Sequence, residues 1–287
     1  MTSVDEFITA IVSKAQEEYT AHHLFASTTI AQAIHETGEG KYIPGKGRSN
    51  NIFGIKWTPK CGFPYVQATT REFINGEWIV VPGAKFRKYA SFDECIEDRS
   101  KILSYPRYGK VPLSANRYEQ CIQLQKCGWA TGPEYGFSLI RDLEAYKLWM
   151  FDPPIVAPPS YEGMITPHFS WQEAKCKDGA PVPEEYKDNA IKLAQRAENL
   201  RSLFDNKPMH VLSWYRTPKY NSGIKGAAKN SEHLRANAMD FYIAGISNQL
   251  IYKAADALGF GGVGLYRWGV HIDNRDLLGK PKARWKG

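Results

Sequence analysis

A proline-rich stretch near the middle of the chain is the feature that most constrains its fold. The segment FDPPIVAPPSYEG, residues 151–163, contains two Pro-Pro pairs. Proline cannot continue a helix, and it favours extended backbone. At 287 residues the chain is also longer than most single domains. We therefore predict two domains, residues 1–150 and 166–287, joined by a Pro-rich linker over residues 151–165.

The patterning before the linker predicts helices with one small β insertion. The opening MTSVDEFITAIVSKAQEEY has apolar residues at helical spacing and lacks the basic start and long apolar run of a signal peptide. Residues 65–89 are rich in β-branched and aromatic side chains, and Asn75-Gly76 is a typical hairpin turn. This half is expected to be mainly helical.

The patterning after the linker predicts a mixture of helix and strand. A capping box at Ser170 and Glu173 is followed by a helical pattern. That helix is expected over residues 186–204, and strands are expected over residues 209–214, 238–243 and 269–272. The whole chain is therefore expected to be α+β.

Charge and cysteine content limit the classes of protein to which this chain can belong. The net charge of +7 favours a polyanionic partner, such as nucleic acid, an anionic membrane or a teichoic-acid-bearing wall. The basic residues are scattered, however, which argues against nucleic acid. The five cysteines form no C-x-x-C pair, so free thiols are expected. No apolar run reaches the roughly 18 residues of a membrane span, so we expect synthesis in the cytoplasm without stable membrane insertion.

Glu36 is a candidate catalytic acid in the segment AQAIHETGEG. Apolar residues precede it at helical spacing and Gly38 is a helix stop, so Glu36 is expected in the last helical turn. There the helix dipole and partial burial both disfavour the carboxylate, which raises its pKa. Taken alone, the segment also fits a solvated surface glutamate.

The surrounding motifs resemble those of the glycoside hydrolase family 73 glucosaminidases. They are AQAIHETGEG, NNIFGIK, KFRKYASFDECIEDRSKIL and GWATGPEYGFSLI, and the resemblance covers residues 7–149. It implies a lysozyme-like fold with a helical lobe and a β-lobe. It also implies that Glu36 is the acid and that Tyr135 lines the sugar cleft. Thr37 stands where the family usually has serine, and Glu39 replaces a common aromatic residue.

A glycosidase normally needs a second carboxylate, whose distance from the acid sets the stereochemistry. Glu72, in the predicted hairpin, matches the acidic position of the family's β-lobe and is our candidate. Glu77, just past the turn, is the alternative. Retaining and inverting chemistry both remain open.

Three residues in the second half form a candidate metal site. KNSEHLRANAMDFY supplies His233 and Asp240, and GVHIDNR supplies His271. Two neutral imidazoles and one carboxylate leave a fourth position open on tetrahedral zinc, as hydrolysis requires. Spacing alone also fits two unrelated histidines and a salt-bridged aspartate.

The second half resembles the zinc D-Ala-D-Ala carboxypeptidases and their phage endolysin relatives. The motifs are SWYRTPKYN, NSEHLRANAMDF and GVGLYRWGVHIDNR, within residues 168–275. The resemblance implies a small α+β domain of the Hedgehog/D-Ala-D-Ala peptidase type. It implies that His233, Asp240 and His271 bind Zn²⁺ and that Arg216 polarises the scissile carbonyl. Ala236 stands where the family motif usually has glycine.

The general base of this site is left open by the sequence. Relatives often carry an acidic residue or histidine two or three positions before the last ligand, where this chain has Trp268 and Gly269. Asp273 is the available substitute, because residues two apart on a strand face the same side. It would serve either as the base or as a group that orients a ligand.

Both resemblances point to one polymer, peptidoglycan, with its sugar strands and short peptides. The sequence therefore predicts a bifunctional, zinc-dependent peptidoglycan hydrolase. A leaderless chain with two lytic domains suggests a monomeric phage endolysin or a virion-associated lysin, acting on the wall after holin-dependent release or from the particle. The alternatives are a non-catalytic wall-binding component of a phage tail and, on charge alone, a nucleic-acid binder.

Overall fold

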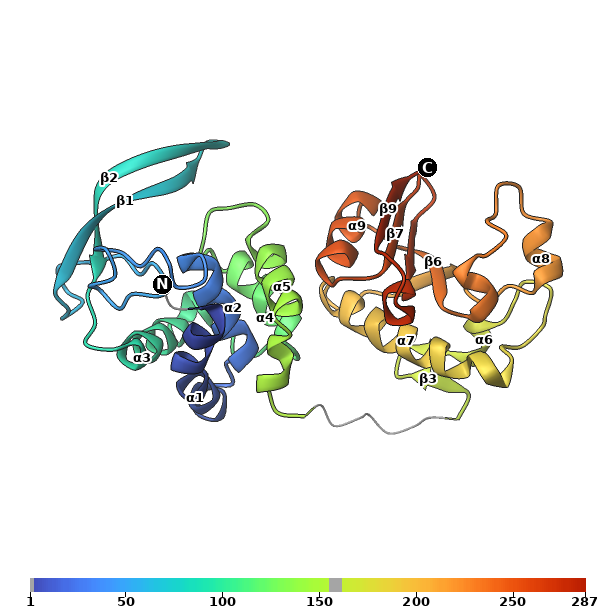
Figure 1. Cartoon of the computed structure of the whole chain (residues 1–287), viewed down its shortest axis with the longest axis horizontal. Coiled ribbons are helices and arrows are strands. Elements are labelled where there is room, and N and C mark those ends of the chain that lie inside the picture. The colour runs from blue at the N-terminus through green and yellow to red at the C-terminus, as the bar shows by residue number, and fades with distance from the viewer. Residues whose placement is uncertain (1–2, 155–161) are drawn as a thin grey trace. The chain divides into compact units, whose positions relative to one another are not determined.

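The computed structural model describes residues 3–154 and 162–287. The chain divides into two compact units, Met1–Pro154 and Ile155–Gly287 (Figure 1). This division falls inside the segment predicted as a linker, whose residues 155–161 lie outside the described part. Within the described residues, no helix has the length and apolar character needed to cross a membrane.

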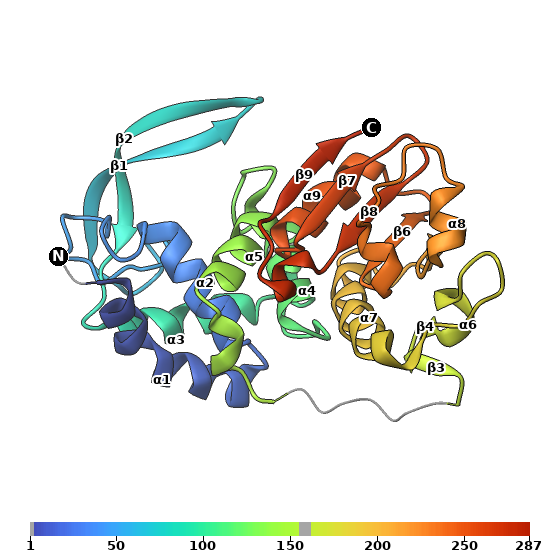
Figure 2. The same ribbon diagram turned by 45° about the vertical axis from the view of Figure 1, so that its right-hand side comes forward.

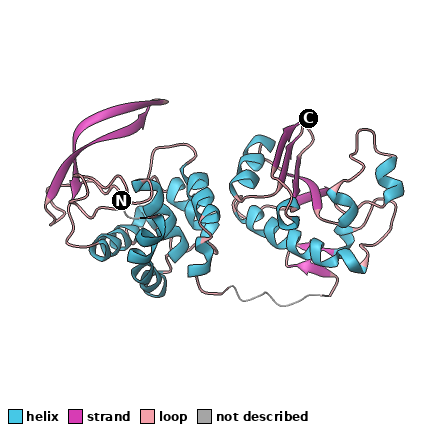
Figure 3. Ribbon diagram, in the orientation of Figure 1, coloured by secondary structure: helices cyan, strands magenta, loops and turns pink. Residues whose placement is uncertain are grey.

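The N-terminal domain is mainly helical, and its strands form one hairpin (Figure 3). Its helices are α1 (Val4–His22), α2 (Ala26–Thr37), α3 (Phe92–Leu103), α4 (Arg117–Lys126) and α5 (Tyr135–Ala145), with short 3₁₀ helices η1 (Pro106–Tyr108) and η2 (Leu148–Phe151). Helix α2 is central because it packs against α1, α4, α5 and η2. Most of its residues are buried, including Ile30, Ala31 and Ile34.

The predicted hairpin is present and extends from the helices (Figure 2). Strands β1 (Tyr65–Ile74) and β2 (Glu77–Arg87) pair antiparallel, with a register shift between Ala68 and Thr70. Asn75 and Gly76 have φ angles of 51° and 88°. A two-residue turn with both central φ values positive matches the twist of the strands, which explains the Asn-Gly signal.

The C-terminal domain combines a five-stranded sheet with several helices. The elements of the sheet are β5 (Met209–Ser213), β6 (Ala238–Ile243), β7 (Gly262–Leu265), β8 (Val270–Asp273) and β9 (Ala283–Lys286), in the order β5-β6-β8-β7-β9. The other elements are the small strands β3 (Met164–Thr166) and β4 (Phe169–Ser170) and the helices α6 (Trp171–Ala174), η3 (Glu184–Tyr186), α7 (Lys187–Ser202), α8 (Pro218–Ser222), η4 (Glu232–Arg235), α9 (Asn248–Ala257) and η5 (Arg275–Leu278). Neighbouring strands are antiparallel except β7 and β9, and α9 packs against the sheet.

The α+β organisation predicted from the sequence is confirmed, but the strands β3, β4, β7 and β9 were not predicted. The capping box at Ser170 and the helix that follows it are present. Strand β7 contains two glycines in four residues, a composition that indicates a turn. The glycines are required by packing, since a Cβ on Gly262 would lie 2.1 Å from Oδ2 of Asp273 and one on Gly264 would lie 2.5 Å from Nε1 of Trp285.

Candidate functional sites

Glu36 lies in the last turn of α2, as predicted. Gly38 ends the helix with a φ of 56°, a conformation that glycine adopts without strain. The Thr37 hydroxyl donates to the carbonyl of Ala33 (2.6 Å) and accepts from the amide of Gly40 (2.7 Å). A serine would offer the same hydroxyl, so the departure at Thr37 preserves the end of the helix that presents Glu36.

Glu36 opens into a cleft of about 1300 Å³. Glu72 lines the same cleft, and its Oε1 lies 2.9 Å from Nζ of Lys56. Among the described residues, Glu77 is not part of the cleft lining, so of the two alternatives it is Glu72 that faces the cleft. Aromatic side chains that the sequence did not single out also line the cleft: Tyr42, Trp78, Tyr108 and Trp129. Such rings are typical of surfaces that bind sugars by stacking.

The surroundings of Glu36 suit a proton donor. Its side chain is half-buried, and burial raises the pKa of its carboxyl, as does the nearby Glu72. The hydrogen bond from Tyr135 and the charges of His35 and Lys56 lower that pKa, but burial outweighs them. The net direction is upward, so Glu36 holds its proton to a higher pH than an ordinary glutamic acid.

Tyr135 has a more specific contact than the predicted lining of a sugar cleft. It is among the lining residues, but only 6% of it is exposed. Its hydroxyl donates to Oε1 of Glu36 at 2.7 Å. Glu39, which replaces the family's aromatic residue, points elsewhere: its carboxylate contacts Tyr146 and Lys41 and does not line the cleft.

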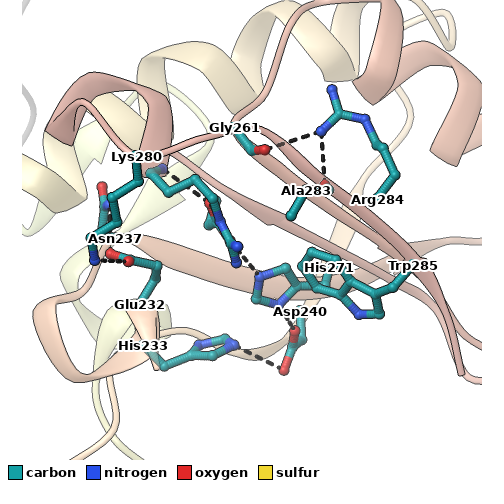
Figure 4. Close-up of polar contacts among 12 residues, drawn as sticks. Glu232, His233, Asn237, Asp240, Gly261, His271, Lys280, Ala283, Arg284 and Trp285 are labelled. Carbon is teal, nitrogen blue, oxygen red and sulfur yellow. Dashed lines mark hydrogen bonds and ion pairs between the residues drawn. The ribbon is translucent and has the colours of Figure 1, made fainter. Parts of the chain in front are cut away.

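In the C-terminal domain, the fold brings the three predicted metal ligands together. His233, Asp240 and His271 are buried, and one ligand atom from each lies within 4.8 Å of the others (Figure 4). Their positions follow from the topology, because Asp240 on β6 is directly opposite His271 on β8. His233 comes from η4, which immediately precedes β6.

The hydrogen bonding and pKa of His233 fit a metal site. Nδ1 of His233 donates to the carbonyl of Trp214 (2.6 Å), which leaves Nε2 as the free acceptor facing Asp240 (3.3 Å). Burial lowers the pKa of His233, and this favours the neutral form that binds metals. Burial also acts to lower the pKa of His271, but the carboxylates of Asp240 and Asp273 raise it overall.

Arg216 lies beside the carboxylate of Asp240. Its Nη2 donates to Oδ2 of Asp240, and its Nε donates to Oγ of Ser213 at 2.8 Å. Arg216 therefore lies next to the three clustered residues. Its guanidinium is partly exposed, so it is accessible to a bound substrate.

Asp273 does not point toward the cluster alongside His271, which corrects the expectation from strand alternation. Nδ1 of His271 faces Asp240 at 2.7 Å, whereas Asp273 contacts the opposite ring nitrogen, Nε2, at 3.1 Å. Asp273 is fully buried and also pairs with Arg275 (2.8 Å). The Asp273 side chain is thus engaged between Nε2 of His271 and Arg275.

The unpredicted strand β9 adds an aromatic side chain beside the cluster. The ring of Trp285 lies 5.1 Å from that of His271, and its Nε1 donates to the hydroxyl of Tyr266 at 2.7 Å. Figure 4 shows Trp285 and His271 side by side. A tryptophan within the basic segment KPKARWKG, residues 280–287, gives no signal in the sequence, because only the parallel pairing of β9 with β7 brings it here.

The donor set fits zinc better than other common metals. Zinc accepts imidazole nitrogen and carboxylate oxygen in four-coordinate sites, and three protein ligands are typical of its catalytic sites. Calcium and magnesium prefer sites built from oxygen alone. Trp214 and Asp273 also supply the hydrogen bonds to the second ring nitrogens that metal-binding histidines usually have.

The chain thus has a helical domain with a cleft that contains Glu36 and Glu72, and an α+β domain with a buried His/Asp/His cluster. Residues 12–148 match the family of mannosyl-glycoprotein endo-beta-N-acetylglucosaminidases. Residues 163–273 match the peptidase M15 family. The chain therefore contains a glucosaminidase-family domain followed by a peptidase M15-family domain, as the sequence motifs predicted.

Individual relatives resemble the N-terminal half. A probable N-acetylmuramidase of Lactococcus lactis subsp. cremoris is 32% identical over 157 residues, which are 52% of this chain and 35% of the relative. The exo-glucosaminidase LytG of Bacillus subtilis is 32% identical over 152 residues, which are 51% of this chain and 52% of LytG. The chain thus spans about a third to a half of these relatives.

A crystal structure of a peptidoglycan hydrolase mutant from Sphingomonas sp. A1 is also similar. It is 30% identical, and the match covers 50% of this chain and 96% of that one with a TM-score of 0.47.

Proposed function

We propose that the protein is a bifunctional peptidoglycan hydrolase. The N-terminal domain cleaves glycan strands, and the C-terminal domain cleaves the peptides attached to them. The observation that carries this proposal is the presence, in one chain, of a half-buried glutamate in a cleft of about 1300 Å³ and of a buried His/Asp/His cluster. The family matches of the two halves and the names of the relatives agree with it.

In the N-terminal domain, Glu36 protonates the oxygen of the glycosidic bond as it breaks. Its raised pKa keeps the proton available, and the hydrogen bond from Tyr135 holds the carboxyl in place. Glu72, across the cleft, supplies the second carboxylate that glycoside hydrolysis normally requires. Lys56 holds the Glu72 side chain in place through their ion pair at 2.9 Å.

In the C-terminal domain, His233, Asp240 and His271 would hold a zinc ion. Zinc bound there would supply Lewis-acid chemistry and activate water. Arg216, partly exposed beside Asp240, stabilises negative charge that develops on the carbonyl oxygen of the cleaved peptide. Asp273 orients the ring of His271 from behind, and we propose this positioning role in place of a role as the general base.

Mass spectrometry of digested cell walls tests both activities. Wild type should produce new reducing ends on N-acetylglucosamine, together with new amino termini or shortened stem peptides. Glu36→Gln should lose the glycan products by about 100-fold or more, because general acid catalysis contributes 10²–10⁴-fold. His233→Ala should lose only the peptide products, so each variant controls for the other. The double variant Glu36→Gln, His233→Ala gives the background. If wild type releases no more fragments than this double variant, the domains bind the wall without cutting it, and the proposal is wrong.

We further propose that the chain is a lysin of a bacteriophage. The support is the pairing, in one chain, of two domains directed at different bonds of the same polymer. Expressed inside bacteria, the protein should lyse the cells only after the membrane is permeabilised with chloroform. Lysis that needs no permeabilisation would contradict this role.

A further inference from the structure

A charged side chain lies in the core of the N-terminal domain. Arg99, on α3, is 0% exposed, and its guanidinium sits over the ring of Phe53. Among the described residues, no carboxylate forms an ion pair with it. Burying a cation without a paired anion is costly, and burial lowers the pKa of Arg99 to about 10. The charge of the buried Glu18 acts against this shift, and hydrogen bonds to the neutral side chains of Gln32 and Thr29 hold the guanidinium in place.

A chain of buried hydrogen bonds links Arg99 to Glu36. Nε of Arg99 donates to Oε1 of Gln32 at 2.6 Å. Nε2 of Gln32 donates to the hydroxyl oxygen of Tyr135 at 2.9 Å, and that hydroxyl donates to Oε1 of Glu36 at 2.7 Å. Gln32 lies four residues before Glu36 on α2, so the helix presents both toward Tyr135.

The direction of every bond in this chain is fixed at its Arg99 end. A guanidinium can only donate, so it must face the oxygen of the Gln32 amide. The amide nitrogen is then left to donate to Tyr135. Because the Tyr135 oxygen already accepts this bond, its own proton is free to point at Glu36. Hydrogen bonds in such a chain polarise one another, which strengthens the last donor.

We propose that Arg99 and Gln32 are positioning residues of the glycosidase site, which hold the Tyr135 hydroxyl as a hydrogen-bond donor to Glu36. This inference rests on the proposed function, in which Glu36 is the acid. Neither residue touches the substrate, and both act through Tyr135. The chain reaches Glu36 from the core, on the side away from solvent.

Other charged groups also face Glu36. His35, from the same helix, pairs with Asp142 of α5 at 3.1 Å. Lys56 pairs with Glu72 of the hairpin. Since both pairs are partly exposed, whereas Gln32 and Arg99 are fully buried, the buried chain is less screened by water and salt.

Gln32→Glu tests the proposal because it keeps the shape of the side chain and reverses one bond. The new carboxylate still accepts from Arg99 and gives it a counterion, so the fold should be preserved. Its second oxygen cannot donate to Tyr135, and it competes with Glu36 for the Tyr135 proton. Glu36 then loses its donor, and its titration midpoint should rise by about one pH unit.

The midpoint is measured by NMR on the full chain with ¹³C-labelled glutamate carboxyls, and the Glu36 signal is assigned from its absence in Glu36→Gln. Tyr135→Phe should raise the midpoint in the same direction. Gln123→Glu is the matched control, since Gln123 is 7% exposed in the same domain and lies outside the chain of bonds. It should leave the midpoint unchanged.

The outcomes separate this inference from the proposed function. A midpoint in Gln32→Glu equal to that of wild type would overturn the positioning role, whatever the activity. Glycan cleavage that survives in Glu36→Gln would overturn the function instead. If both hold, the alkaline limb of the pH profile of glycan cleavage should move upward in Gln32→Glu together with the NMR midpoint.

Discussion

Asp152→Ala should destabilise the N-terminal domain strongly, because one buried carboxylate holds two distant parts of it together. Oδ1 of Asp152 accepts from the amide of Ser27 (2.9 Å), and Oδ2 accepts from its hydroxyl (2.6 Å). Nε of Arg117 lies 2.7 Å from Oδ2, and the Asp152 side chain is fully buried. The N-cap residue of α2, Phe25, has no side-chain capping bond. Asp152 therefore supplies the cap of the helix that carries Glu36.

The expected loss is about 3–5 kcal/mol in the free energy of unfolding, the usual cost of removing one partner from a buried ion pair. A lost helix cap alone would cost only about 1 kcal/mol. The double variant Asp152→Ala, Arg117→Leu should recover part of the loss, because no uncompensated charge remains.

Guanidinium unfolding, followed by hydrogen exchange of peptides from each domain, measures this loss. The C-terminal domain serves as the internal reference and should not change. Glu17→Ala is the control variant, since its exposed pair with Lys14 should contribute less than about 1 kcal/mol. A loss below about 1 kcal/mol in Asp152→Ala would refute the capping and ion-pair reasoning.

Three further predictions concern the two sites. Zinc at 100 times its Kd should stabilise the C-terminal domain by about 2.7 kcal/mol in differential scanning calorimetry; a chelator should reverse this without shifting the N-terminal transition, and His233→Ala should not respond to zinc. Because burial raises the pKa of Glu36, glycan cleavage should persist above the ordinary glutamate pKa of about 4.3 and fall as pH rises through the raised value; a pH profile that falls at the ordinary value would contradict this. Gly262→Ala should weaken zinc binding at least about 10-fold in a competition titration, because the new Cβ would lie 2.1 Å from Oδ2 of Asp273; unchanged affinity would show that Asp273 does not orient its histidine.

Features set by neighbouring residues could be predicted from the sequence. The helix end at Gly38, the hairpin turn at Asn75-Gly76 and the capping box at Ser170 all depend on bonds within a few residues. The candidate residues of the two sites could also be named from the sequence, because their motifs stand in the same order as in known families. For this reason Glu36 and the three clustered residues of the C-terminal domain were all anticipated.

Features set by distant residues could not be predicted. Strand β7 has the composition of a turn, and its glycines make sense only because Asp273 and Trp285 press against them. Strand alternation also does not specify which ring nitrogen of His271 Asp273 contacts, and only the structure places it at Nε2.

The sequence by itself determined which chemical groups are present and which local turns and helix ends present them. Only the tertiary structure decided which of these groups meet. Gln32 and Arg99 are 67 residues apart in the sequence, and no local pattern links them. The physical reason is that local backbone preferences act over a few residues, whereas burial and hydrogen bonding in a core depend on packing between distant segments.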